Sequence, residues 1–133
     1  MNPYYPEVAR RAERRCEYCR APEAIFNFPF EVEHIWPQAD RGPDELHNLA
    51  LACRCCNGHK TDFTHAIDPE SGDDVPLFHP RRETWSEHFA FDVESLELRG
   101  ITPTGRATVA RLNMNRLSQI SGRSFWVRLG LYP

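Results

Sequence analysis

The sequence predicts an α+β fold, a small mixed domain held together by a four-cysteine metal site. Three observations predict it. Two Cys-x2-Cys pairs are separated by 33 residues, strand-like alternation lies between and beyond them, and a helical apolar stripe runs through the last third of the chain. With 133 residues, 41% of them hydrophobic, the chain suffices for one core. We therefore expect a single domain over residues 1–133.

The elements of the first half follow from local patterns. Apolar and basic positions at helical spacing predict a short helix over residues 6–15. Alternation over residues 25–34 predicts a strand that ends at His34, and the apolar run at 49–52 predicts its returning partner across a polar loop. A helix is expected over residues 57–66. The order is thus strand, loop, strand and helix, with the cysteine pairs at its base.

The second half is less regular. Residues 67–83 are rich in Pro, Gly and Asp and predict a connecting loop. Two strands are expected within residues 85–99. The Thr-Pro pair at 102–103 predicts a helix start, with Thr as the N-cap and Pro in the first turn. A last short helix is expected at 125–129.

Composition restricts the compartment and the class of protein. No apolar run approaches the length that spans a membrane, and the first residues lack the basic and apolar regions of a secretory signal. We therefore expect a cytoplasmic protein with no membrane partner. Cysteines stay reduced there, so Cys-x2-Cys pairs indicate metal ligands, and an odd total of five argues against a disulfide framework.

The charge pattern leaves the partner open. A formal net charge of −3 does not favour nucleic acid, yet fifteen of the sixteen basic residues are Arg, which binds phosphate oxygens in pairs. Two groups of them, within 10–15 and 106–128, would give a locally basic face. The alternative for either group is a solvated helix surface.

Four of the cysteines, Cys16, Cys19, Cys53 and Cys56, have the spacing of a tetrahedral thiolate site. Such a site selects zinc, and four thiolates leave no open coordination position. The predicted zinc is therefore structural. Cys55 could replace Cys56, but we expect it to be a packed or free thiol because Cys-x2-Cys is the commoner turn.

Glu33 and His34 are candidates for chemistry on a phosphodiester. A neutral His can take a proton from water, and a carboxylate can hold a hard divalent cation. Adjacent strand residues point to opposite faces, so both serve one site only if the strand ends or bends there, as Pro37 permits. A structural His beside a surface carboxylate is the alternative.

Four polar residues flank this pair in the sequence. Asn48 could hold the loop after His34 through its amide, or form an Asx turn. Asn57 could be a metal ligand or a helix N-cap. Lys60 is a candidate for phosphate binding, and His59 is either a third metal contact or a surface residue.

The ordered combination resembles the zinc-knuckle branch of the HNH endonucleases. The residues that carry the resemblance are Cys16-x2-Cys19, Glu33-His34-Ile-x-Pro37, Asn48-Leu and Cys53-x2-Cys56-Asn57-x2-Lys60. A looser similarity to stand-alone bacterial members extends through the remainder. The resemblance implies a ββα-metal (His-Me finger) core over residues 16–66 and a C-terminal extension over 67–133.

The resemblance also implies roles for single residues. His34 would be the general base, Asn48 would orient the His-bearing loop, and Glu33 with Asn57 would hold one Mg²⁺ or Mn²⁺. Glu33 stands where Asp is usual and Asn57 where a His is frequent. Both keep an oxygen ligand, and His59 is a possible substitute.

The implied activity is metal-dependent hydrolysis of DNA that leaves 5′-phosphate and 3′-hydroxyl ends. One site cuts one strand, so double-strand cleavage would need a homodimer or two visits. Two other classes compete: a zinc-knuckle module that binds nucleic acid without catalysis, and an interaction protein in which the zinc is only a staple. The set Glu33, His34 and Asn57 discriminates, because a pure binding module has no use for it.

Overall fold

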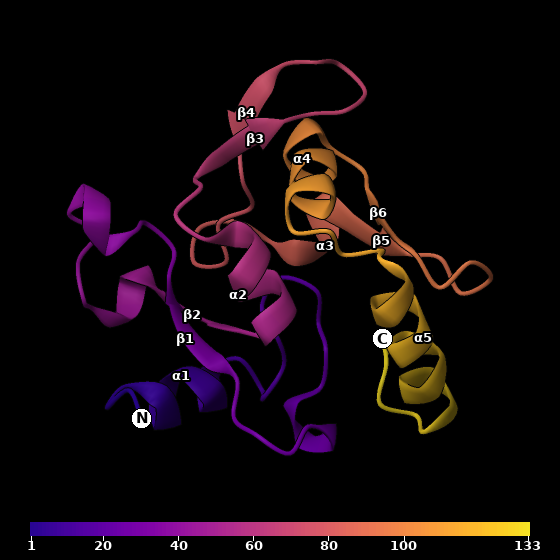
Figure 1. The fold of residues 1–133 in the computed structure, drawn as a ribbon, viewed down its shortest axis with the longest axis horizontal. Coiled ribbons are helices and arrows are strands. Elements are labelled where there is room, and N and C mark those ends of the chain that lie inside the picture. The colour runs from indigo at the N-terminus through magenta and orange to yellow at the C-terminus, as the bar shows by residue number, and fades with distance from the viewer.

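The computed structural model describes every residue, 1–133 (Figure 1). Its helices and strands are α1 (Tyr5–Arg11), β1 (Glu31–His34), β2 (Leu49–Ala52), α2 (Arg54–Lys60), β3 (His65–Ile67), β4 (Asp74–Pro76), α3 (Trp85–His88), β5 (Phe89–Phe91), β6 (Leu98–Gly100), α4 (Pro103–Arg111) and α5 (Leu117–Arg128). Short 3-10 turns precede β1 and punctuate the loop between β1 and β2. The predicted mixture of helices and strands is confirmed.

The strands form three separate two-stranded antiparallel hairpins, β1–β2, β3–β4 and β5–β6. In the first hairpin Glu33 pairs with Ala50 and His34 with Leu49, without a bulge. Both α1 and α2 pack on this hairpin, whereas α4 packs on the other two (Figure 1). The chain order β1, β2, α2 is the strand, strand and helix order that the sequence predicts.

The strand end at His34 and the returning strand over 49–52 are confirmed, but β1 begins at Glu31, later than the alternation over 25–34 predicts, because a 3-10 turn occupies Glu23–Ile25. The helices of the first half also differ from expectation. The helix predicted over 57–66 begins at Arg54, because Cys53 is its N-cap and accepts a hydrogen bond at Sγ from the Cys56 backbone N–H at 3.4 Å. It ends at Lys60, since Thr61 has a positive φ of 47°. The helix predicted over 6–15 is likewise shorter, because two consecutive residues, Glu13 and Arg14, have positive φ.

In the second half, the loop predicted over 67–83 contains a hairpin that the sequence did not reveal. Strands β3 and β4 have three residues each, too few for alternation to be read, and Gly72 at φ +80° sits in the turn between them. The helix start at 102–103 is confirmed: Thr102 Oγ1 accepts from the Gly105 N–H at 2.9 Å. The last helix begins at Leu117, well before the predicted residue 125.

One apolar core connects both halves. It contains 23 buried residues, drawn from α1 through to Tyr132. Two hydrogen bonds tie the C-terminal half to the first cysteine pair, from Trp85 Nε1 to the Tyr18 carbonyl at 2.7 Å and from the Tyr132 hydroxyl to the Cys19 carbonyl at 2.8 Å. No helix combines the length and the apolar character needed to cross a bilayer.

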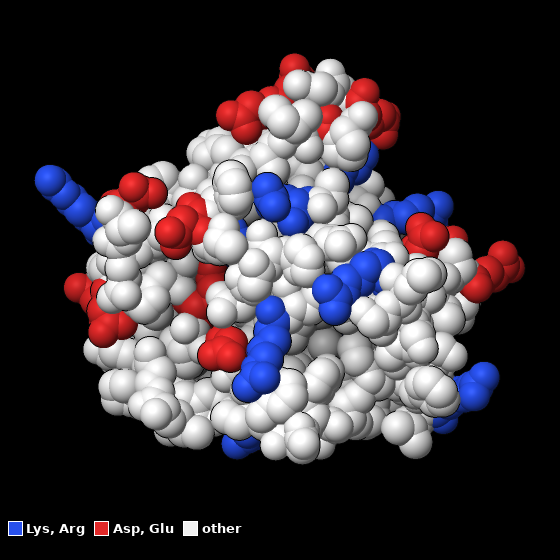
Figure 2. All heavy atoms as spheres, viewed as in Figure 1, with Lys and Arg blue, Asp and Glu red and all other residues white.

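Charge is unevenly distributed on the surface in Figure 2, with acidic side chains gathered at the tip of the β3–β4 hairpin. Those of the tip include Glu70, Asp73 and Asp74, all exposed. Basic side chains lie nearer the centre of this face, over the region between α2 and α5.

Candidate metal centre and active site

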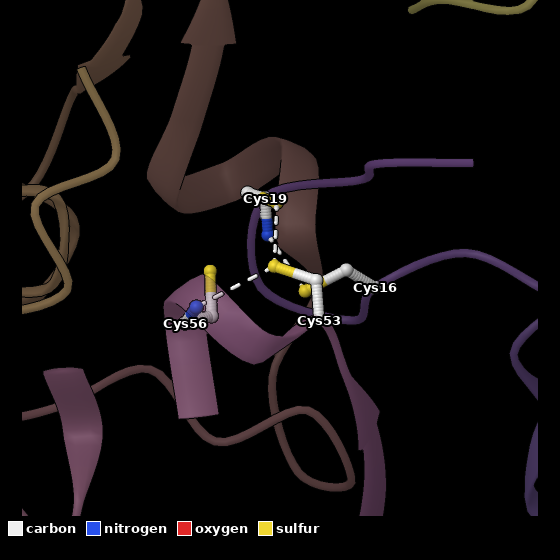
Figure 3. Close-up of side chains that lie close together, drawn as sticks. All are labelled: Cys16, Cys19, Cys53 and Cys56. Carbon is white, nitrogen blue, oxygen red and sulfur yellow. Dashed lines mark hydrogen bonds between the residues drawn. The ribbon is translucent and has the colours of Figure 1, made fainter. Parts of the chain in front are cut away.

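The four cysteines converge on one buried point (Figure 3). Cys16 and Cys19 belong to the turn after α1, and Cys53 and Cys56 to the start of α2. All four sulfurs lie within 4.8 Å of one another, and the Cys19 and Cys53 sulfurs are 3.7 Å apart. A tetrahedral zinc with Zn–S bonds of about 2.3 Å requires sulfurs about 3.8 Å apart. The donor set therefore fits zinc.

Cys55 lies outside this cluster, as the Cys-x2-Cys spacing predicts. Its half-buried Sγ is 3.7 Å from His59 Nδ1, and burial raises the pKa of its thiol. No other group of three His, Cys, Asp or Glu side chains converges as the four cysteines do.

His34 ends β1 and remains partly accessible, with 17% of its side chain exposed. Its Nε2 lies 3.0 Å from Asp44 Oδ1, a carboxylate in the loop between β1 and β2. A carboxylate on Nε2 favours the tautomer with its proton there, so Nδ1 keeps the lone pair. In that tautomer Nδ1 is the ring nitrogen that can accept a proton.

Asn48 closes the loop that begins after His34. Its Oδ1 accepts from the Trp36 N–H, and its Nδ2 donates to the Trp36 and Pro43 carbonyls, all at 2.9 Å. The side chain is 4% exposed, so these bonds are shielded from water and costly to lose. The bonds cross the loop instead of bridging neighbours, which argues against the Asx-turn alternative. This is the contact pattern that an orienting role requires.

Glu33 points away from His34, into the protein. The carboxylate is 4% exposed; Oε2 accepts from the Tyr18 hydroxyl at 2.9 Å and Oε1 lies 2.5 Å from Lys60 Nζ. Burial raises the pKa of Glu33, and the ammonium of Lys60 opposes that rise. Because β1 stays regular to its end, neighbouring side chains keep to opposite faces. The structure thus does not bring Glu33 and His34 to one site.

Lys60 is equally far from the role that the sequence suggested. It is 1% exposed, and its Nζ also donates to the backbone carbonyls of Ile35 at 3.1 Å and His34 at 3.4 Å. In this position the ammonium does not reach a phosphate in solvent. Instead it joins α2 to the end of the strand that carries His34.

Asn57 and His59 lie on α2 between the zinc cluster and Lys60. Asn57 is half-buried within the helix, so the N-cap alternative does not hold, since Cys53 occupies that position. His59 Nδ1 bonds the Cys55 carbonyl at 2.8 Å, and its ring borders a cavity on the side of α2 that faces α5. Both carboxylate oxygens of Glu33 contact Lys60 or Tyr18. Glu33 and Asn57 therefore do not form a shared cation site in this arrangement.

Comparison with known families places these residues in one motif. Residues 16–63 match the family model of the HNH endonucleases. This match covers a little over a third of the chain, and we call residues 16–63 the HNH segment after it. Comparisons with curated proteins and with solved structures found no match.

Within and beyond the HNH segment, several arginines expected on a basic face have structural roles. Arg11 donates to the Leu46 and Leu49 carbonyls, and Arg106 pairs with Asp68 at 2.9 Å. Arg123 is fully buried and donates to the Leu96 and Met114 carbonyls. Arg54, Arg116 and Arg128 stay exposed. The basic surface is thus smaller than the arginine count suggests.

Two site residues were missed by sequence reasoning. Asp44 lies ten positions from its partner His34, within a loop where acidic residues are ordinary. Tyr18 lies between two cysteines and reads as a spacer. A third feature, a cavity of about 500 Å³, adjoins the loop that Asn48 holds. Among the side chains that line it are Trp36, His47, His65, His79 and Arg82.

Proposed function

We propose that this protein is a metal-dependent endonuclease that hydrolyses phosphodiester bonds in DNA, leaving 5′-phosphate and 3′-hydroxyl ends. The observation that carries the proposal is the HNH match together with a partly exposed His34 at the end of β1, on a loop pinned by Asn48. The order β1, β2, α2 supports a ββα-metal core over residues 16–66, with residues 67–133 as an extension of the same domain.

His34 is the proposed general base. Asp44 holds Nε2, so Nδ1 takes the proton from the attacking water, and the Asp44 carboxylate stabilises the imidazolium that forms. Asn48 acts through the backbone, because its three hydrogen bonds fix the loop that supplies Asp44. Such general-base catalysis typically contributes about 10²- to 10⁴-fold to the rate.

A divalent cation, Mg²⁺ or Mn²⁺, would supply charge stabilisation on the phosphate and the departing oxygen. Of the two ligands that the family resemblance implies, we retain Asn57. Glu33 would have to leave Lys60 and Tyr18 to join it. His59 is directed to the cavity facing α5 and is not part of the proposal for this cation.

The first experiment is cleavage of supercoiled plasmid by the zinc-loaded protein with Mg²⁺, with Mn²⁺ and without added cation. We expect cation-dependent nicking in the wild type and at least a hundredfold loss in His34→Ala. Arg99→Ala is the control, since Arg99 is an exposed residue of β6 that lines neither of the two cavities described above. Equal cleavage by wild type and His34→Ala would exclude His34 as the base.

The same assay tests the competing class. A folded, zinc-loaded wild type that binds DNA without cutting it under any cation would favour a binding module without catalysis. Linear product formed in a single step, with second-order dependence on protein, would indicate that two copies cut together.

A further inference from the structure

A second cavity, of about 690 Å³, separates α2 from α5. The cavity lies between the HNH segment and the C-terminal extension, with residues of both in its lining. Figure 2 shows a hollow bordered by basic side chains at the place where Figure 1 shows the space between α2 and α5. Its volume is within the range of small-molecule sites, roughly 300–1,000 Å³. The side chains that give it chemical character are Phe26, Phe28, Arg54, His59, Arg116 and Gln119.

The polar lining of this α2–α5 cleft favours an anion. No aspartate or glutamate lines it. Arg54 and Arg116, one at the start of each helix, are both exposed. Arg54 is 3.7 Å from Glu31 outside the cleft, a loose contact that leaves most of its donors free. Arg116 donates a hydrogen bond from Nε to Ser118 Oγ at 2.8 Å, which leaves its two terminal nitrogens available to a ligand. Two such guanidinium groups suit a phosphate.

Aromatic rings form the apolar part of the cleft. Phe28 lies under the Arg54 guanidinium at 4.1 Å. Phe26 lies between Phe28 and Trp126 in tilted contacts, with ring centroids 5.8 and 6.0 Å away and interplanar angles of 58°. Phe26 and Phe28 are only half-buried. Partly exposed rings beside arginines are the usual surface on which unpaired bases stack.

Gln119 adds an unused hydrogen-bond donor. It is 8% exposed, and its buried Nε2 has no hydrogen-bond partner. The group beside it is the Cys55 thiol, which is a weak acceptor. A buried amide without a good acceptor is costly unless a ligand supplies one, and the edge of a nucleobase carries such acceptors.

We propose that the α2–α5 cleft binds one unpaired nucleotide of a single-stranded segment of the substrate. The phosphate lies between Arg54 and Arg116, the base packs against the partly exposed rings of Phe26 and Phe28 beside the Arg54 guanidinium, and the Gln119 amide bonds the base edge. A base that packs on these rings has left its partner in a duplex, so the substrate would contain an unpaired region. This inference rests on the proposed function and narrows its substrate class.

The test is binding of a fluorescent 12-nucleotide single strand and of the matching duplex, measured by anisotropy without added Mg²⁺ or Mn²⁺. We expect the single strand to bind at least tenfold more tightly. Phe28→Leu should weaken single-strand binding roughly tenfold, because stacking is lost, and change duplex binding little. Arg116→Gln should weaken it and lower the salt slope by about one.

Arg99→Gln is the matched control, since Arg99 is an exposed arginine on β6, outside the cleft. Both cleft variants change surface residues, and their thermal unfolding and zinc content verify that the fold is kept. Equal affinity for single strand and duplex, or unchanged affinity in both variants, would overturn the proposal. Tighter binding of free dAMP than of the single strand would assign the cleft to a mononucleotide and overturn it too.

Failure of this inference is separable from failure of the proposed function. Plasmid nicking that is lost in His34→Ala but unchanged in Phe28→Leu and Arg116→Gln would support the proposed nuclease and rule out nucleotide binding in the cleft. Single-strand binding that needs Phe28, in a protein that cuts nothing, would keep the cleft and remove the nuclease.

Discussion

Two regions anchor α2 to the chain that precedes it, and they do so by opposite means. At its first turn, Cys53 and Cys56 meet Cys16 and Cys19 in a buried cluster whose sulfur spacing fits one zinc ion, which would bind the four as thiolates. At its last turn, Lys60 meets Glu33, and the two charges neutralise each other. The difference shows that the two ends of one short helix can be tied to the same preceding chain by different chemistry, a thiol cluster that fits a metal at one end and an ion pair at the other.

The largest effect is expected at the cysteine end. Cys53→Ser removes one zinc ligand but leaves α2 a side-chain N-cap, since Ser is favoured at that position. Structural zinc sites contribute on the order of 10–16 kcal/mol of apparent binding free energy. We expect loss of zinc and of the cooperative unfolding transition, measured by metal content and circular dichroism. Cys55→Ser should keep both. A Cys53→Ser variant that retains one zinc per chain would contradict the four-cysteine assignment.

A smaller loss of stability is expected when the Lys60–Glu33 pair at the last turn of α2 is broken. Breaking a buried ion pair from one side typically costs about 3–5 kcal/mol, whereas replacing both partners is often neutral. Glu33→Gln and Lys60→Met should each lower the midpoint of denaturant unfolding strongly, and the double variant should recover most of it. Additive losses in the double variant would show that the two side chains do not act as a pair.

The Glu33→Gln and Lys60→Met variants and their double variant also test whether Glu33 binds the catalytic cation. If the carboxylate serves Lys60, the Mn²⁺ concentration that half-saturates cleavage should be restored in the double variant together with stability. A stable double variant that needs at least tenfold more Mn²⁺ would instead make Glu33 a ligand and require it to leave Lys60 during the reaction.

The smallest effect concerns a second ion pair, between Asp68 and Arg106, in which the pKa of the carboxylate shifts in the opposite direction to that of Glu33. Asp68 is fully buried, and its hydrogen bonds to Arg106 hold its pKa well below the usual value, whereas burial raises the pKa of Glu33. A lowered folded-state pKa gives stability that is present above about pH 4 and is lost as pH falls toward the folded value. Arg106→Gln should therefore destabilise the protein more at pH 7 than at pH 3, measured by denaturant midpoints. An equal loss at both pH values would mean that the pair is not electrostatically linked.

Sequence reasoning predicted the parts of the site that are set by spacing. The cysteine pattern, the strand end at His34 and the returning strand all depend on residues close in sequence or on a fixed ligand geometry, and the structure has them there. The placement of Lys60 could not be read the same way. A lone lysine after a helix start is almost always exposed, and only the tertiary contact with Glu33 and two carbonyls explains its burial.

The two missed partners, Tyr18 and Asp44, have the same physical explanation. The role of each side chain depends on a residue that is distant in sequence and close only in the folded protein. The residues next to it in the sequence give no indication of that contact. The α2–α5 cleft is a further case, because one wall comes from the HNH segment and the other from a helix more than fifty residues later.

The hydrogen bond from Tyr132 to the Cys19 carbonyl has a consequence for biosynthesis. All four zinc ligands have been made once Cys56 is added, but the side chain that covers the first cysteine pair is the second to last of the chain. At ~5–20 residues per second, ribosomes need several seconds to add the intervening segment. During that interval Tyr132 is not yet there to cover the first cysteine pair, and the nascent cluster is more open to its metal.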